Sequence, residues 1–264
     1  MTCLAQSFGA LVVADAKLET VRAASANLFA LAGVEASSAV GEGVGAVVGF
    51  ETVHLCRNAL GYPFINEVGE VVAFTGANGR RLEAVVFASG AEAFLEIAYA
   101  AEEIKASNLL RRFAASLSHE VDPLTAVAEA ARMICDCDEV VACYRGAASY
   151  GVARADLPNP VTTLAGEEAR SVALLSDADA PLAKFYGDAS HISAPLALAL
   201  SHEPSLSGFA SVMRAKGAIF AQCGDLFLIG WADQAIHVTP EASRIVSLAA
   251  RLASSTMAGR ALSA

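Results

Sequence analysis

The sequence has no long apolar run and no cluster of basic residues, and these two absences argue against several classes of protein. Every stretch of about 20 residues is interrupted by Asp, Glu, Arg or Gly, which argues against a membrane-spanning helix. The apolar run near the start lacks a preceding basic segment and stops at Asp15, so we expect no secretory signal and a cytoplasmic location. Lys and Arg number 18 against 28 Asp and Glu, and the tightest basic group is Arg111-Arg112, so nucleic acid is not expected as a partner.

The short motifs of common enzymes are also missing. Neither H-x-x-x-H nor G-x-S-x-G occurs, which argues against a zinc hydrolase and a serine hydrolase. The Gly-rich run from Gly41 to Gly49 fits neither a dinucleotide fingerprint nor a P-loop, since no Lys-Ser/Thr pair follows, and we interpret it as a flexible loop. We therefore expect a protein that is not an enzyme.

The overall composition is typical of a folded protein with reduced thiols. Apolar residues make up 55% and charged residues 17% of 264 residues, which excludes disorder and suits two domains or one large one. The mean hydropathy is +0.48. Six cysteines in a cytosolic chain indicate thiols rather than disulfides. Cys135 and Cys137 form the only close pair, and without a second pair of ligands we favour structural thiols over a metal site.

The first 100 residues alternate short apolar runs with turns. The pattern predicts a short helix over Ser25–Leu31 that ends at Gly33, and five strands. The strands are expected at Gly9–Ala14, Leu18–Ala24, Val68–Thr75, Arg81–Ala88 and Ala93–Ala98. Five antiparallel strands with helices on one side are the plan of a PAS-type domain over residues 1–100.

From residue 101 to 264 the pattern predicts a second α/β domain, of the GAF type, which shares a helix with the first. Asp122 and Pro123 are typical of a helix start. Helices are expected at 101–117, from Asp122-Pro123 to Ile134, at Pro181–Tyr186, at Leu206–Ala215 and from Thr239 to Met257. Strands are expected at Glu139–Arg145, Ile192–Leu200, Ala218–Cys223 and Leu226–Trp231, with irregular chain from 146 to about 176. The expected fold class is therefore α/β (α+β), with two domains that each contain an antiparallel sheet flanked by helices.

Six segments, in the same order along the chain, resemble the PAS–GAF photosensory core of bacterial phytochromes. Gln6–Leu11 is similar to the Q-P-H-G-A-L entry of the PAS domain, and Ala24–Asn27 to its A-S-A-N helix. The other four similarities lie at Glu139–Arg145, at Asp179-Ala180-Pro181 with Tyr186, at Ser201-His202 with Met213–Gly217, and at Phe227–Trp231. The resemblance implies a PAS domain followed by a GAF domain, and a linear tetrapyrrole as the family's ligand.

Most of the groups that such a ligand needs are replaced in this sequence. Cys3 is a poor substitute for the family's attachment cysteine, and the second possible attachment site falls at Gly208-Phe209. The resemblance places Ala221 and Cys223 at propionate-binding serines, and Ala232 and Asp233 at a pocket histidine. Two buried propionates without donors are unfavourable by several kcal/mol. We therefore expect a degenerate pocket and no covalent bilin.

The leading hypothesis is a non-enzymatic PAS–GAF signalling or adaptor protein, with no cofactor and a separate signalling protein as its output partner. The alternative is a photoreceptor that binds a biliverdin-type bilin or another tetrapyrrole without a covalent bond. For that case the candidate pocket residues are Asp179, Tyr144, Tyr186 and Cys223.

A third hypothesis concerns Phe113–Leu124, which resembles the phospho-acceptor box of histidine kinases and would make His119 a phosphotransfer residue. No D-x-G-x-G motif of an ATP-binding domain follows it, which favours a solvent-facing His119.

The ends of the chain give two further expectations. The few residues before Gln6 suggest a reduced or absent version of the knot that the family forms between its N-terminal segment and its GAF domain, and no third photosensory domain is expected after the last helix. Apolar residues at helical spacing in that helix predict a homodimer interface that includes Ile245, Leu248 and Leu252.

Overall fold

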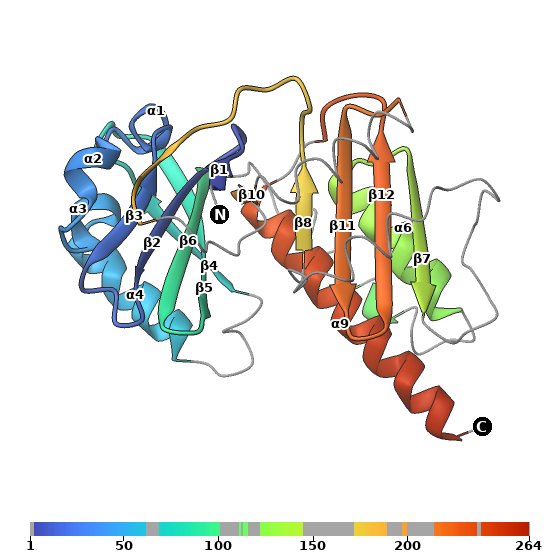
Figure 1. The fold of residues 1–264 in the computed structure, drawn as a ribbon. Helices are drawn as coiled ribbons and strands as arrows, with labels where there is room; N and C mark the ends of the chain where they lie inside the picture. Colours follow the sequence, from blue (N-terminus) through green and yellow to red (C-terminus); the bar gives the residue numbers. More distant parts are fainter. Residues whose placement is uncertain are drawn as a thin grey trace. The chain divides into compact units, whose positions relative to one another are not determined.

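The structure, a computed structural model, describes residues 3–61, 69–100, 111, 113–115, 122–144, 172–188, 197–199, 214–236 and 239–263. The chain divides into two compact units (Figure 1). Unit 1 contains Met1–Glu102, Ala180–Ser201 and Thr239–Arg244, and unit 2 contains Glu103–Asp179, His202–Val238 and Ile245–Ala264. The first segment of unit 1 thus ends at Glu102, and two later segments of the chain belong to the same unit.

Unit 1 is built on a six-stranded antiparallel sheet in the order β4-β5-β6-β2-β3-β9. All five strands predicted from the alternation of apolar residues are present, with small shifts at their ends. The bounds are Ala10–Asp15 for β2, Val21–Ser25 for β3, Glu70–Thr75 for β4, Arg81–Ser89 for β5, Glu92–Tyr99 for β6 and Phe185–Gly187 for β9.

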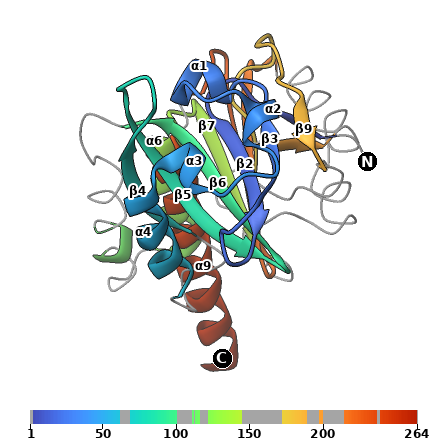
Figure 2. The same cartoon turned by 90° about the vertical axis from the view of Figure 1, so that its left-hand side faces the viewer.

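Four helices cover one face of this sheet (Figure 2). They are α1 (Leu28–Ala32), α2 (Ala36–Ala39), α3 (Gly45–Val48) and α4 (Phe50–Leu60). Alternate residues of the strands, such as Val12, Leu82 and Leu95, pack with buried helix residues such as Leu28 in one apolar cluster. The period of two in the strands therefore produces the core that the sequence predicts.

The structure corrects the prediction that the Gly-rich run from Gly41 to Gly49 is a loop. Its last part forms α3, and Gly49, with φ +85°, separates α3 from α4. The prediction of a loop fails there because the Val residues of the run are buried: Val44, Val47 and Val48 all belong to the core of unit 1. Burial of these side chains outweighs the low helix propensity of glycine.

The structure also corrects the prediction for residues 180–201. Pro181–Tyr186 does not form the predicted helix; Phe185 begins β9, which pairs with β3. Ala183 pairs with Ala5. The strand β10 (Ala197–Ala199) pairs with β1 (Cys3–Ala5). The described parts of this segment therefore contact the start of the chain.

Unit 2 contains a four-stranded antiparallel sheet in the order β7-β12-β11-β8. The bounds are Glu139–Tyr144 for β7, Val172–Leu175 for β8, Gly217–Cys223 for β11 and Leu226–Ala232 for β12. Three of these strands are as predicted, whereas β8 lies where irregular chain was expected. The helices α6 (Pro123–Cys135) and α9 (Pro240–Ser263) begin where the sequence predicts, and α9 runs past the expected end at Met257.

The two remaining predicted helices are mostly beyond the description. Of 101–117, only 111 and 113–115 are described, and these are helical. Of 206–215, only the last two residues are described. In the part of the chain that is described, no helix combines the length and the hydropathy needed to cross a bilayer.

Candidate functional site

The sheet of unit 2 carries two of the four predicted pocket residues close together. Leu226 pairs with Cys223 on one side and with Tyr144 on the other. Residues directly opposite each other in neighbouring strands project from the same face, so Tyr144 and Cys223 share a face on either side of Leu226. Two strand spacings place them about 10 Å apart. Both side chains are half-buried.

Asp179 lies at the opposite end of that sheet. Its neighbour Ala178 donates a main-chain hydrogen bond to Lys216 at 2.8 Å, and Lys216 donates one to Ala232 at 2.9 Å. The seven-residue strand β11 separates this end from Cys223, which corresponds to about 20 Å. The exposed Asp179 carboxylate forms an ion pair with Lys216 at 3.6 Å. Asp179 therefore does not join Tyr144 and Cys223.

Tyr186 belongs to a different unit altogether. It lies in β9, where it pairs with Ala24 of unit 1, and its side chain is 48% exposed. The structure thus brings Tyr144 and Cys223 together and places Asp179 at the opposite end of the same sheet, whereas Tyr186 is part of unit 1.

Two of the substituted pocket residues belong to the core. Ala221 and Ala232 have no exposed surface. Asp233 is exposed, and its main-chain N–H donates to Asp138 Oδ2 at 2.8 Å. Gly208 and Phe209 lie outside the described residues, and so does the side chain of Cys3.

The strands of unit 2 supply no positive charge. Their residues are EVVACY in β7, VALL in β8, GAIFAQC in β11 and LFLIGWA in β12, without Lys, Arg or His. Among the described residues, the buried acceptor Oε1 of Gln222 has no hydrogen-bond partner, although Nε2 of the same side chain donates to the Gly224 carbonyl at 3.3 Å. The described strands can therefore pack apolar groups but offer no counter-charge for a carboxylate.

Three cysteines of unit 2, Cys135, Cys137 and Cys143, are poor nucleophiles. Burial raises the pKa of the Cys137 thiol to about 12, assisted by the charges of Asp138 and Asp136. Burial, together with Cys137, raises the pKa of Cys135 well above its usual value, and burial also raises that of Cys143. These directions are those of structural thiols, as the sequence predicts. Among the described residues, no group of three or more His, Cys, Asp or Glu side chains is placed to hold a metal ion.

The predicted interface residues of α9 differ in exposure. Ile245 is only 1% exposed and belongs to the core, Leu248 is half-buried, and Leu252 is 41% exposed. Of the three, only Leu252 is exposed enough to contact a partner with a large part of its side chain. His119 lies outside the described residues, so its phosphotransfer role stays a prediction.

A hollow in unit 1 escaped the sequence analysis. It has a volume of about 300 Å³, and no single motif spans it, because its walls come from residues 18 to 57. The lining residues are Leu18, Glu19, Gly43, Val44, Gly45, Phe50, Val53, His54 and Arg57. The available signal was the spacing of Phe50, His54 and Arg57, which places three side chains on one face of α4.

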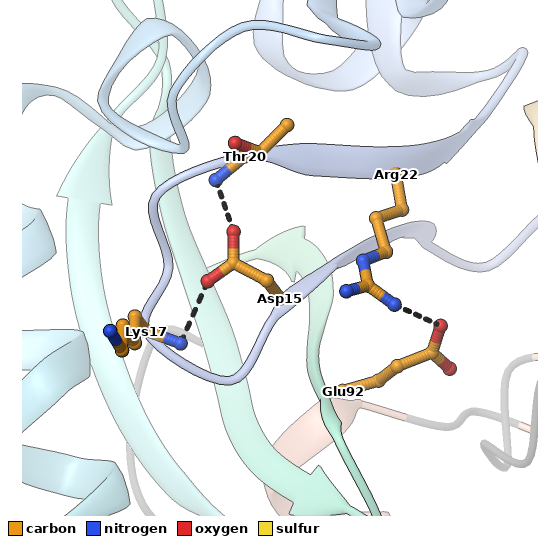
Figure 3. Close-up of polar contacts among 5 residues, drawn as sticks. All are labelled: Asp15, Lys17, Thr20, Arg22 and Glu92. Carbon is orange, nitrogen blue, oxygen red and sulfur yellow. Dashed lines mark hydrogen bonds and ion pairs between the residues drawn. The ribbon is translucent and has the colours of Figure 1, made fainter.

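The loop between β2 and β3 forms one wall of this hollow and is fixed by Asp15 (Figure 3). The Asp15 carboxylate accepts main-chain hydrogen bonds from Lys17 at 2.8 Å, Thr20 at 2.6 Å and Glu19 at 3.3 Å. Burial alone would raise the pKa of Asp15, but these hydrogen bonds and the charge of Arg22 outweigh it and hold that pKa below 3.8. Arg22 itself pairs with Glu92 at 3.5 Å.

Comparison with known proteins agrees with this architecture. Residues 1–120 match a family model described as a PAS fold. No curated protein matches the chain. The chromophore-binding domain of a Stigmatella aurantiaca phytochrome superposes with a TM-score of 0.68 at 16% identity, over 96% of this chain and 95% of that one. The chain has a phytochrome-like PAS–GAF fold.

A second solved structure supports the same phytochrome-like fold. The chromophore-binding domain of an unusual bacteriophytochrome from R. palustris superposes with a TM-score of 0.68 at 15% identity, over 97% of this chain and 94% of that one. The larger photosensory core module of the Stigmatella aurantiaca phytochrome gives a TM-score of 0.69 at 14% identity, and this chain covers 58% of it. The resemblance noted in the sequence is thereby confirmed at the level of the fold.

Proposed function

We propose that this chain is a non-enzymatic, phytochrome-like PAS–GAF signalling protein that acts through contact with another protein and carries no covalently bound bilin. The observation that supports it is the absence of Lys, Arg and His from the described strands of unit 2. A linear tetrapyrrole brings two propionates, and buried carboxylates without partners are unfavourable by several kcal/mol.

The thiols support the same proposal. Covalent attachment requires a thiolate, and the raised pKa of Cys143 keeps that group protonated at neutral pH. Cys223 shares its face with Ala221, a buried residue without hydrogen-bonding atoms in its side chain. A cytoplasmic location, where thiols stay reduced, completes this proposal.

The test is reconstitution with biliverdin. The purified full chain is incubated with the pigment, its absorption spectrum is recorded, and a denaturing gel is stained with zinc to reveal covalent adducts. The chromophore-binding domain of the Stigmatella aurantiaca phytochrome serves as the positive control. We expect neither a red absorption band nor zinc fluorescence from this chain, and zinc fluorescence that a Cys223→Ala variant abolishes would overturn the proposal.

A second candidate function is non-covalent binding of a bilin. Its support is the superposition on chromophore-binding domains over 96–97% of this chain. A red absorption band without zinc fluorescence would select it. Tyr144→Phe should then shift the band, because Tyr144 is the half-buried hydroxyl of the unit 2 sheet that the resemblance assigns to the pocket.

The output surface that we propose includes the exposed side of α9. Leu252, at 41% exposure, is the exposed large apolar residue among the described side chains of α9, whereas Ile245 is held in the core. Light scattering of the full chain and of Leu252→Ser, with Ile245 left intact, tests a homodimer. An unchanged mass for the variant would remove Leu252 from the interface.

A further inference from the structure

Hydrogen bonds to main-chain carbonyls hold the walls of the unit 1 hollow together. Arg57 Nε donates to the Lys17 carbonyl at 3.0 Å, which ties α4 to the loop between β2 and β3. The Val21 N–H donates to the Glu42 carbonyl at 2.8 Å, which ties the Gly-rich turn to the start of β3. The hollow is therefore largely formed before any ligand enters, as ligand sites usually are.

The loop that faces α4 is held in an unusual conformation. Leu18 has a φ of +58°, in the left-handed region that a leucine rarely adopts, and its side chain is fully buried. The hydrogen bonds to Asp15 that flank it compensate this strain. The consequence is that the backbone of Glu19 is fixed at the edge of the hollow, where it packs against Gly43.

The floor of the hollow is apolar, and an aromatic ring stands at its rim. Leu18, Val44 and Val53 are buried and close the floor. Phe50 is 84% exposed, which is unusual for so large an apolar side chain. Its ring lies on Gly45, where an added Cβ would come within 2.8 Å of the ring. The glycine thus makes room for a ring that has one face free to stack.

Three ionisable side chains surround this apolar floor. They are the carboxylate of Glu19 and the side chains of His54 and Arg57, all exposed. Among the residues that the structure describes, the carboxylate of Glu19 and the imidazole of His54 have no hydrogen bond or ion pair, and the terminal nitrogens of Arg57 have none either. The hollow therefore offers a carboxylate, an imidazole and a guanidinium group beside an aromatic ring.

We propose that this hollow binds a small zwitterion with a flat apolar group, of which an aromatic α-amino acid is the representative. Its carboxylate would pair with Arg57 and His54, its ammonium group with Glu19, and its ring would stack on Phe50. A simple organic anion would leave Glu19 beside a second negative charge. The volume of about 300 Å³ is at the lower end of ligand pockets, which favours a ligand of amino-acid size.

This proposal does not rest on the proposed function. The hollow lies within unit 1, and the argument about the bilin concerns the strands of unit 2. The two can fail separately, because biliverdin reconstitution and amino-acid binding are measured with different ligands.

The test is a comparison of three ligands by titration calorimetry on the full chain. They are L-phenylalanine, 3-phenylpropanoate, which lacks the ammonium group, and phenethylamine, which lacks the carboxylate. Loss of one charge-assisted contact should weaken binding about tenfold or more. We expect phenylalanine to bind at least about tenfold more tightly than either analogue. No binding of phenylalanine, or equal binding of all three, would overturn the proposal.

Substitutions then assign the contacts. Glu19→Gln should remove the preference for phenylalanine over 3-phenylpropanoate, His54→Gln should weaken both acids about tenfold, and Phe50→Ala should weaken all three ligands. Glu51→Gln is the matched control, because Glu51 is exposed on α4 and does not line the hollow. All four positions are exposed, so the variants should fold, which circular dichroism verifies. Binding that Glu19→Gln and His54→Gln leave unchanged would also overturn the proposal.

Discussion

The carboxylate of Asp15 accepts a 2.6 Å hydrogen bond from the main-chain N–H of Thr20, five residues further along the chain. The loop that this contact closes contains Leu18, a buried side chain on a left-handed backbone. A single acidic residue therefore decides the conformation of the connection between two central strands and of one wall of the hollow.

Asp15→Asn should make the stability of unit 1 less dependent on pH. Because the pKa of Asp15 is held below 3.8 in the folded state, its contribution is present above that value and is lost as pH falls through the folded pKa. We expect the variant to lose about 1 kcal/mol of unfolding free energy near neutral pH and to match the wild type in strong acid. Urea denaturation across this range measures it, with the exposed Glu42→Gln as control. A deficit that persists in strong acid would contradict the prediction.

Asp122→Ala should destabilise the start of α6. The Asp122 carboxylate accepts from the Thr125 N–H at 3.0 Å and from its hydroxyl at 2.9 Å. Loss of an N-cap side chain costs about 1 kcal/mol, whereas Asn at the same position should restore most of it. Urea denaturation of the two variants measures the difference. Equal stability of Asp122→Ala and the wild type would show that the cap is dispensable.

Local rules sufficed for much of the fold. Asp122 and Pro123 predict the start of α6, and Gly33, with φ +75°, ends α1 as its position suggests. Alternating apolar residues predict β2 and β4 to β6 because both faces of each strand have a fixed role. These signals lie within a few residues of the element that they specify.

The failures concern contacts between distant parts of the chain. Phe185 and Tyr186 form a strand only because β3, about 160 residues earlier, offers an edge to pair with. The register of β7, β11 and β12 likewise brings Tyr144 close to Cys223, and no local pattern in the sequence specifies that register. The pocket role of Tyr144, Cys223, Asp179 and Tyr186 stays a prediction. No sequence motif marks the hollow, because its walls come from separate segments that meet only after folding.

Gly187→Ala should weaken the pairing of β9 with β3. Gly187 has a φ of +84°, and an added Cβ would collide with the Arg22 carbonyl. Gly90→Ala is the matched control, because Gly90 also has a positive φ, +62°, but has open space around it. Backbone strain is thus common to both variants, and the difference between them isolates the collision. We expect Gly187→Ala to unfold at a lower urea concentration than Gly90→Ala and to be cleaved faster by protease within residues 180–201. Equal behaviour of the two variants would contradict the pairing.

The buried thiols should react slowly in the folded protein. Burial raises the pKa of Cys56 to about 11, and burial with the neighbouring carboxylates raises that of Cys137 to about 12. Because the thiolate is the reactive form, labelling by a disulfide reagent at neutral pH should be much slower in the native protein than in urea, and should accelerate as pH rises toward these values. The contribution of these thiols to stability is present below pH 9.0 and is lost as pH rises through the folded pKa.

The variants Cys56→Ala and Cys137→Ala assign the slow phases of this reaction to single residues, one in each unit. Loss of a slow phase in each variant is the expected result. Rapid labelling of Cys137 in the native protein would instead place its sulfur at the surface. The Cys135-Asp136-Cys137 turn could then reach a metal ion, and the interpretation of this pair as structural thiols would have to be given up.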